Sequence, residues 1–241
     1  MGVTASCRNG TGYESDHGGT GSEAPEPTMN GDEVIETVVC REDELPDYGM
    51  KCFAVEGSTV LVVREYGLLS ALGSKCSHYG APLENGEFTN GRIRCPWHGA
   101  CFNAKTGDIE DYPGLDSIPR YDIDIEDGYV KVRAPLSELL ANKRTKPMAN
   151  RDPENLTTFV VIGGGAAGAT CVEKLRQEGF TGQVTLVSRE EHLPYDRPKL
   201  SKAMDLTSDK ITLRSQQFYE SGDIELRLGT TAVSVDTEGK K

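Results

Sequence analysis

Two short segments of the chain each carry one cysteine followed by one histidine, Cys76–His78 and Cys95–His98. Together they offer two thiolates and two imidazoles. This ligand set suits a [2Fe–2S] cluster in which one iron is bound by two cysteines and the other by two histidines. Because the cysteine leads in both segments, two similar loops can close on such a cluster from opposite sides. The predicted metal ligands are Cys76, His78, Cys95 and His98.

Zinc is the main alternative, because two cysteines and two histidines also form structural zinc sites. A zinc finger, however, places its cysteines close together and both histidines on a helix. Here each segment holds one residue of each kind, and Pro96 and Gly99 make the second segment a poor helix. A set of four unrelated core residues is a weaker alternative, because two of only four histidines in the chain fall here. The sequence therefore favours the iron–sulfur cluster.

The pattern C-x-H followed by C-P-x-H-G resembles the signature of the Rieske family. Turn-forming residues flank the ligands in both segments, namely Gly80, Pro82, Pro96 and Gly99. The resemblance implies an all-β Rieske domain, a small β-barrel or sandwich with two cluster-binding loops. Short apolar runs separated by Gly-rich turns favour the same architecture. The expected strands are Val34–Cys40, Lys51–Val55, Ser58–Val63, Leu68–Ala71, Asp122–Ile125 and Tyr129–Arg133.

Residues beside the ligands predict the kind of Rieske centre. In high-potential members of the family each loop has a further cysteine, and the two form a disulfide; the matching positions here are Ala81 and Trp97. Those members also donate serine and tyrosine hydroxyls to the cluster, where this chain has Ala100 and Phe102. Hydrogen bonds to sulfur stabilise the reduced cluster, so their absence lowers the potential. We expect a low-potential centre, with Cys101 as a packed side chain and not a ligand.

A second motif lies downstream, where the apolar run Phe159–Ile162 precedes a glycine-rich turn and a helical stretch, Ala169–Gln177. A strand, a G-x-G-x-x-G turn and a helix form the dinucleotide-binding fingerprint, in which the helix N-terminus holds the pyrophosphate. A second strand, Gln183–Val187, and an acidic residue after it complete the pattern. Glu190 is the first candidate for the ribose hydroxyls and Glu191 the second. The predicted contacts in the turn are Gly163, Gly165, Ala166, Ala167 and Gly168.

The segment Pro194–Lys202 indicates which dinucleotide binds. It resembles the pattern P-Y-x-R-P-x-L-S-K of FAD-dependent ferredoxin reductases. That resemblance implies that Arg197 and Lys202 reach the FAD pyrophosphate and isoalloxazine, where fixed cations stabilise phosphates and reduced flavin. The segment Gly229–Val233 is similar to the one that meets adenine in that family, with Ala232 as the expected contact.

The order of the two motifs resembles the apoptosis-inducing-factor-like Rieske flavoproteins, from about residue 34 onward. The resemblance implies an oxidoreductase that passes electrons from NAD(P)H to FAD, then to the cluster and to an unknown acceptor. A second G-x-G-x-x-G and the late Gly-Asp motif of the family do not occur in the chain. We therefore expect the N-terminal fragment of such an enzyme. Its Rossmann-like α/β domain would be truncated, its FAD site incomplete, and the fragment inactive with NAD(P)H.

Two other functions use a Rieske-type cluster. A Rieske oxygenase needs a mononuclear iron bound by two histidines and a carboxylate, and only the distant His17 and His192 remain for it. An electron carrier or redox-sensing module without turnover stays as the alternative to the reductase. No catalytic residue is assigned. The expected organisation is a disordered tail (1–33), the Rieske domain (34–135), a linker that starts with a short helix (136–157) and the partial FAD domain (158–241).

The net charge of −12 and the pI near 4.9 argue against a nucleic-acid partner and leave room for a basic electron-transfer partner. The cysteines outside the cluster show no pairing pattern, which favours a reducing intracellular compartment, either cytoplasmic or mitochondrial. No apolar run is long enough to span a membrane, and no secretory signal is present. The start of the chain fits the myristoylation pattern at Gly2, and Cys7 offers a second lipid site, so a membrane tether is one prediction.

Overall fold

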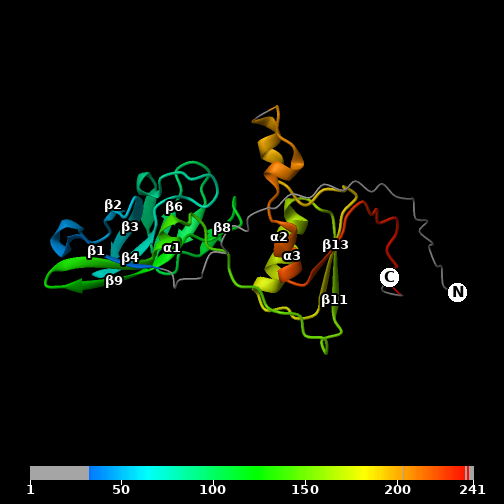
Figure 1. The fold of residues 1–241 in the computed structure, drawn as a ribbon, viewed down its shortest axis with the longest axis horizontal. Helices are drawn as coiled ribbons and strands as arrows, with labels where there is room; N and C mark the ends of the chain where they lie inside the picture. Colours follow the sequence, from blue (N-terminus) through cyan, green and yellow to red (C-terminus); the bar gives the residue numbers. More distant parts are fainter. Residues whose placement is uncertain (1–32, 203, 237, 239–241) are drawn as a thin grey trace, which may run out of the picture. The chain divides into compact units, whose positions relative to one another are not determined.

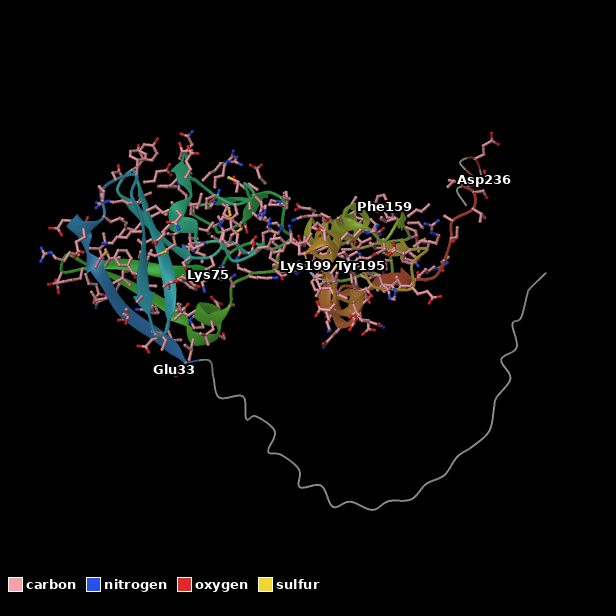
Figure 2. All side chains as sticks on the ribbon, turned by 90° about the horizontal axis from the view of Figure 1, so that it is seen from above. Glu33, Lys75, Phe159, Tyr195, Lys199 and Asp236 are labelled. Atoms are coloured by element: carbon pink, nitrogen blue, oxygen red, sulfur yellow. The ribbon has the colours of Figure 1, made fainter. Side chains whose placement is uncertain are left out.

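The computed structural model describes residues 33–202, 204–236 and 238 (Figure 1). The predicted acylation site at Gly2, its neighbour Cys7 and nearly all of the predicted tail lie outside these residues. Residues 34–135 contain two antiparallel sheets and are called the all-β part below. Residues 158–236 contain a parallel sheet with helices and are called the α/β part, in which Phe159, Tyr195 and Lys199 are labelled in Figure 2. Within the described residues, no helix is long and apolar enough to cross a membrane.

The larger sheet of the all-β part has six strands in the order β1-β10-β9-β4-β3-β2. Its strands are β1 (Val34–Arg41), β2 (Met50–Val55), β3 (Ser58–Glu65), β4 (Leu68–Gly73), β9 (Arg120–Glu126) and β10 (Tyr129–Pro135). All six strands predicted from the sequence are confirmed, each within one or two residues at either end. Three two-residue hairpin turns join neighbours, at Glu56–Gly57, Tyr66–Gly67 and Asp127–Gly128, and both residues of each turn have positive φ. Such turns match the twist of the strands they join.

The smaller sheet has four strands of three residues each, in the order β5-β6-β7-β8. They are β5 (Glu87–Thr89), β6 (Arg92–Arg94), β7 (Cys101–Asn103) and β8 (Ile109–Asp111). The sequence did not predict these strands, because three residues are too few to show a period of two. A shared core that includes Leu61 and Leu72 from one sheet and Ile93 and Phe102 from the other holds the two sheets together.

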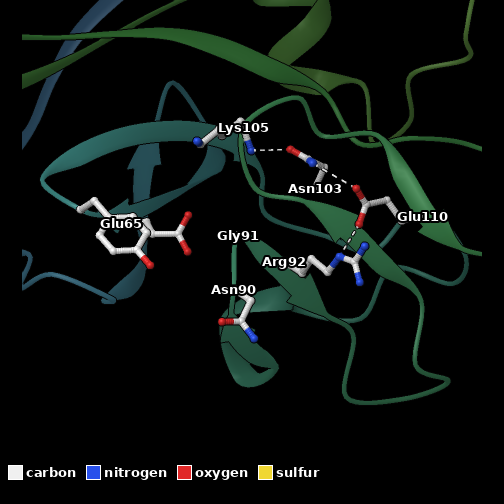
Figure 3. A pocket seen from close by; sticks show the side chains of 8 residues that line it. Glu65, Asn90, Gly91, Arg92, Asn103, Lys105 and Glu110 are labelled. Atoms are coloured by element: carbon white, nitrogen blue, oxygen red, sulfur yellow. Dashed lines mark hydrogen bonds and ion pairs between the residues drawn. The ribbon is translucent and has the colours of Figure 1, made fainter.

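Polar pairs tie the outer face of the smaller sheet (Figure 3). Arg92 Nε lies 2.7 Å from Glu110 Oε2, and the Asn103 amide donates to Glu110 Oε1 at 3.0 Å. These contacts connect β6, β7 and β8 and line a polar hollow beside the turn at Asn90 and Gly91. All are exposed or partly exposed, so we assign them to the fixing of strand register and expect each to contribute less than about 1 kcal/mol.

The segment between the two parts starts with the predicted short helix, α1 (Leu136–Leu140), whose Leu139 is buried against the larger sheet. Elsewhere in the described part of the chain there are four short 3-10 helices, η1 (Glu42–Glu44), η2 (Leu83–Asn85), η3 (Arg197–Ser201) and η4 (Ser208–Ile211). Of these, η3 falls within the segment predicted to contact FAD.

The α/β part is built on a parallel sheet in the order β11-β12-β13. Its elements are β11 (Thr158–Ile162), α2 (Ala166–Gln177), β12 (Gln183–Val187), α3 (Gln216–Ser221) and β13 (Ile224–Arg227). Strands added in one direction with right-handed connections place their helices on one face, and α2 and α3 lie on the same side of the sheet (Figure 1). The helix α2 begins at Ala166, three residues before the predicted start, because Gly165 in extended conformation forms its N-cap.

Candidate cluster and dinucleotide sites

The first cluster loop, residues 76–81, turns back on itself through two backbone hydrogen bonds. The Cys76 N–H donates to the Ala81 carbonyl at 2.8 Å, and the Gly80 N–H donates to the Cys76 carbonyl at 2.9 Å. Gly80 has a φ of 78°, which a side chain would strain. The loop leaves β4 and enters the short helix η2, so sheet and core fix both of its ends.

The second cluster loop, residues 95–100, repeats this scheme. The Cys95 N–H donates to the Ala100 carbonyl at 2.8 Å, the Gly99 N–H donates to the Cys95 carbonyl at 3.2 Å, and Gly99 has a φ of 74°. It connects β6 to β7. The prediction of two similar loops is therefore confirmed at the level of individual hydrogen bonds, and each loop places its cysteine at the same position of the turn.

The two loops bring the four predicted ligands together. Cys76 and Cys95 are both buried, and Cys95 is close enough to contribute to the raised pKa of the Cys76 thiol. The rings of His78 and His98 lie edge to face with centroids 5.0 Å apart. His78 is half-buried and His98 is exposed, as is Trp97 beside it. The thiols thus form the inner side of the site and the imidazoles the outer side.

The chemistry of this donor set fits a metal cluster. Burial raises the pKa of the Cys76 thiol to about 11, although the backbone N–H groups of His78 and Tyr79 point at the sulfur and lower it. A thiolate at neutral pH therefore needs a cation beside it. His78 Nδ1 is buried without a hydrogen-bond partner. Since buried polar atoms are almost always paired, this nitrogen is available to a metal.

The same geometry bears on the choice between a cluster and a single ion. Among the described residues, no three of His, Cys, Asp and Glu are grouped around one point as a mononuclear site requires. In a mixed-ligand [2Fe–2S] cluster each iron takes only two protein ligands. The cysteine pair and the histidine pair match that requirement, one pair for each iron.

The residues from which a low cluster potential was predicted lie around the two cluster loops. Ala81, Ala100 and Phe102 are buried around the loops and have no hydroxyl group to donate. Cys101 is buried in β7, as expected of a packed side chain. All the cysteines that the structure describes are free.

The glycine-rich turn between β11 and α2 leaves space for a ligand. A Cβ atom at Gly163 or Gly165 would meet no atom within 4 Å, whereas one at Gly168 would lie 1.9 Å from the Gly163 carbonyl oxygen. Gly168 is thus required for the close packing of helix and turn, and the other two leave the backbone open. Ala166 and Ala167 are exposed in the first turn of α2, where free N–H groups and the helix dipole favour a phosphate.

The acidic and basic residues predicted for the dinucleotide contact each other. Arg197 Nη2 lies 2.6 Å from Glu190 Oε1, just beyond the end of β12. The Gly229 N–H donates to the Glu190 carbonyl at 3.0 Å, so the segment that leads to the exposed Ala232 starts at the same place. Lys202 is exposed at the end of η3. The candidate ribose, pyrophosphate and adenine contacts therefore share one edge of the parallel sheet.

Some residues that sequence reasoning did not single out contact the site. Asp116, in the loop between β8 and β9, accepts hydrogen bonds from Arg214, which follows η4. Asp196 accepts one from Tyr79, next to the ligand His78. Asp196 lies inside the segment Pro194–Lys202 and Tyr79 directly follows the ligand His78, but no motif contains Asp116 or Arg214, and only the three-dimensional structure connects them.

Comparison with known proteins gives the family. Residues 36–122 match the Rieske [2Fe-2S] domain, and residues 157–241 match the pyridine nucleotide-disulphide oxidoreductases. Apoptosis-inducing factor 3 of Homo sapiens is 42% identical over 222 residues, which cover 90% of this chain and 37% of that protein. The chain therefore carries a Rieske domain followed by pyridine nucleotide-disulphide oxidoreductase sequence, and it is similar to apoptosis-inducing factor 3 across both. It spans well under half of the length of that relative.

Each half of this Rieske protein also matches separate proteins. The reductase component of a p-cumate 2,3-dioxygenase system from Pseudomonas putida is 42% identical over 88 residues, which are 35% of this chain and 22% of that protein. The ferredoxin of carbazole 1,9a-dioxygenase from Nocardioides aromaticivorans is similar at 29% identity and a TM-score of 0.40, covering 42% of this chain and 97% of the ferredoxin. The match to both domains confirms the predicted fold class, an all-β Rieske domain followed by Rossmann-like sequence.

Proposed function

We propose that the chain holds a [2Fe–2S] cluster through Cys76 and Cys95 on one iron and His78 and His98 on the other. One observation carries the proposal: two loops with the same hydrogen-bond scheme bring two buried thiols and two outward imidazoles together. The unpaired Nδ1 atom of His78 supports it. Such a cluster carries one electron at a time, and the exposed edge of His98 gives it contact with a partner.

We further propose that the α/β part binds FAD. Gly163 and Gly165 admit the pyrophosphate to the N-terminus of α2, and Gly168 lets the helix pack against the turn. Arg197 neutralises the pyrophosphate and Glu190 accepts from the ribose. The open space at the first two glycines supports this assignment. The remaining proposed contacts are Ala166, Ala167, Lys202 and Ala232. A bound flavin would convert the electron pair of NAD(P)H into single electrons that an iron–sulfur centre accepts.

For the whole protein, these parts favour an electron-transfer oxidoreductase that uses NAD(P)H, FAD and the Rieske cluster in that order. The net charge of −12 favours a basic protein as the acceptor, since opposite charges steer association. Free thiols and an iron–sulfur cluster suit a reducing compartment. The alternative, a redox-sensing module, would load the same cluster but would not be reduced by NAD(P)H in the whole protein.

The cluster is tested by anaerobic reconstitution of the chain with iron and sulfide. We expect two irons per chain, a rhombic mixed-ligand EPR signal after dithionite reduction, and a potential at the low end of the Rieske range, about −150 mV. Cys95→Ala should lose the signal, whereas the control Cys101→Ala, a buried cysteine outside the loops, should keep it. Stoichiometric zinc without iron would refute the assignment, and a potential above zero would refute the argument from the missing hydroxyls.

The FAD assignment is tested by binding, followed through the quenching of flavin fluorescence. We expect Arg197→Gln to weaken FAD binding at least about tenfold, the effect of losing one charge-assisted hydrogen bond to a phosphate. Lys210→Gln, which removes an equally exposed charge from η4, is the control and should bind like the wild type. Equal affinities of the Arg197→Gln variant and the wild type would contradict the assignment.

A further inference from the structure

A buried ion cluster connects the all-β part to the α/β part. The Arg214 guanidinium donates to both oxygens of Asp116, at 2.6 and 3.1 Å, and to both oxygens of Glu173, at 2.8 and 2.9 Å. Asp116 belongs to the all-β part, Glu173 to α2 and Arg214 to the segment before α3. The side chains of these three residues, here called the ion triad, are 11% exposed or less.

The carboxylate of Asp116 has further polar partners outside the ion triad. Asp116 also accepts from the Thr145 hydroxyl at 3.0 Å, and Lys143 Nζ lies 3.9 Å from its other oxygen. An arginine held in two planar, bidentate contacts has one favoured geometry. Removing one partner of a buried ion network is costly, because it leaves a buried charge without compensation. The ion triad therefore has the properties of a device that fixes one relative arrangement of its three elements.

The ion triad is connected to the cluster ligands. Ser77, between Cys76 and His78, donates its buried hydroxyl to the Asp116 carbonyl at 2.6 Å. In the same loop, a Cβ on Gly114 would lie 3.4 Å from the Cα and Cβ of His78, so this backbone packs directly on the ligand. The position of Asp116 thus sets the position of the first cluster loop.

A second contact joins the same two surfaces. The Tyr79 hydroxyl donates to Asp196 Oδ2 at 2.8 Å, and its ring stacks on that of His78 with centroids 3.9 Å apart. Lys199 Nζ lies 5.6 Å from the centre of the Tyr79 ring and 3.5 Å from Asp196. Tyr79 therefore bridges a cluster ligand and the segment predicted to contact FAD.

Asp196 and Arg214, which contact the all-β part from the α/β part, lie on two segments that pair with each other. Tyr195 forms a bridge with Thr212, since the Asp196 N–H donates to the Ile211 carbonyl and the Leu213 N–H to the Pro194 carbonyl, each at 2.8 Å. Asp196 and Arg214 are thus held by the same short pairing. Beside it lies a cavity of about 300 Å³, lined by His78, Tyr79, Ala166, Thr170, Arg197 and Lys199 among others. This cavity has a cluster ligand on one side and the N-terminus of α2 on the other.

We propose that the ion triad of Asp116, Glu173 and Arg214 docks the first cluster loop on the FAD-binding surface of the same chain, with Tyr79 as the bridging side chain. His78 then faces the flavin site of its own chain, while His98 stays exposed. The three residues of the triad act as positioning residues. The inference rests on the proposed function only for the identity of the two cofactors. The partner of the His78 face is this chain and not a separate carrier.

The test measures the distance between the two parts while the cluster is present. A Gd³⁺ tag on Cys171, an exposed cysteine of α2, is placed in a Cys7→Ser, Cys52→Ser background. Dipolar EPR then records its coupling to the dithionite-reduced cluster. We expect one narrow distance in the parent chain. Arg214→Gln should broaden or abolish it, and Arg133→Gln, which breaks the ion pair with Glu36 inside the all-β part, should not change it.

A second variant and two controls separate a loss of docking from unfolding of the α/β part. Arg214→Gln leaves two buried carboxylates without their cation and can unfold the α/β part, so Tyr79→Phe, which strands no charge, is the second variant and should also broaden the distance. The EPR signal of the cluster and the far-UV circular dichroism should stay unchanged. An unaltered narrow distance in both variants, or a broad one in the parent chain, would overturn the docking.

The experiments distinguish a refutation of the docking from a refutation of the proposed cofactors. Neither the tag nor the cluster signal requires FAD, so docking is measured even where flavin does not bind. If the chain holds zinc, the proposed cluster fails, and docking is then measured by the rate of tryptic cleavage after Arg151 in the connecting segment. We expect that rate to rise at least fivefold in Arg214→Gln relative to Arg133→Gln. Equal rates would refute the docking without any reference to iron.

Discussion

Arg176, at the scale of single residues, is a fully buried cation held by backbone carbonyl groups. Its guanidinium donates to the carbonyl oxygens of Gly222, Phe180, Gly182 and Asp223, at 2.6, 2.7, 2.8 and 2.9 Å. Burial lowers the pKa of this group from its ordinary value. The side chain fastens the end of α2 to the loops that precede β12 and β13. Its role is structural, and nothing in a local sequence pattern distinguishes it from an exposed helical arginine.

Replacement of Arg176 by methionine should strongly destabilise the α/β part. Each carbonyl left unpaired in the interior costs about 1–3 kcal/mol, so we expect a loss of more than about 3 kcal/mol in the free energy of unfolding. Urea titration followed by circular dichroism measures it. Arg151→Met, at an exposed arginine of the connecting segment, is the control and should change the stability by less than about 0.5 kcal/mol. A similarly small change in Arg176→Met would contradict this account.

The free cysteines should differ in reactivity. Burial, and then the carboxylate of Glu84, raise the pKa of the Cys52 thiol to about 12. Because only the thiolate reacts, Cys52 should resist iodoacetamide at pH 8 and become reactive only as the pH approaches 12. Cys171 is exposed and should be modified first. Peptide mass spectrometry over time measures both rates, and equal rates at pH 8 would show that Cys52 is not shielded.

At the scale of elements, the sequence predicted those strands, helices and loops that have a periodic hydrophobic pattern or a recognisable motif. The six longer strands, the α2 helix and the two cluster loops follow from alternation, from the helical stretch and from the spacing of cysteine and histidine. The four strands of the smaller sheet were missed, because each is set by its neighbours and not by its own three residues. The edge strand β11 was read as an apolar run, yet Phe159, Val160 and Ile162 are exposed, since burial depends on what packs on a strand.

Two glycines with open space around them should respond differently to alanine. A Cβ at Gly128 or Gly165 would meet no atom within 4 Å, but Gly128 has a φ of 77° in the turn between β9 and β10, whereas Gly165 has a φ of −82°. We expect Gly128→Ala to cost about 1–2 kcal/mol of stability through backbone strain alone. Gly165→Ala should cost no stability and should weaken FAD binding. Thermal unfolding and flavin titration measure the two effects, and a stability loss in Gly165→Ala would contradict the argument.

At the scale of the whole molecule, the contacts between the two parts could not be predicted from the sequence. Asp116 lies 98 positions from Arg214, and Glu173 lies 41 positions from it. No periodic pattern or motif spans such separations, and each residue alone reads as an ordinary surface charge. The two cofactor motifs predict that electrons pass between the flavin and the cluster. The ion triad and Tyr79 supply the arrangement in which that transfer can take place within one chain.

The acidic charge of the chain predicts how its reoxidation depends on salt. With a net charge of −12, transfer from the reduced cluster to a basic acceptor such as cytochrome c should slow as ionic strength rises, because salt screens the attraction. Transfer to the anionic oxidant ferricyanide should become faster, because the same salt screens repulsion. Stopped-flow absorbance measures both rates. The same trend with both oxidants would show that the long-range charge does not steer the encounter.

The exposed indole beside His98 has an optical consequence. Trp97 is the single tryptophan of the chain and is 58% exposed. An excited indole adjacent to a coloured iron–sulfur centre loses its energy to that centre before it can emit. We therefore expect the tryptophan emission of the chain to report cluster occupancy, with strong emission in the metal-free form and weak emission in the loaded form. It allows cluster assembly and loss to be followed in real time without any added dye.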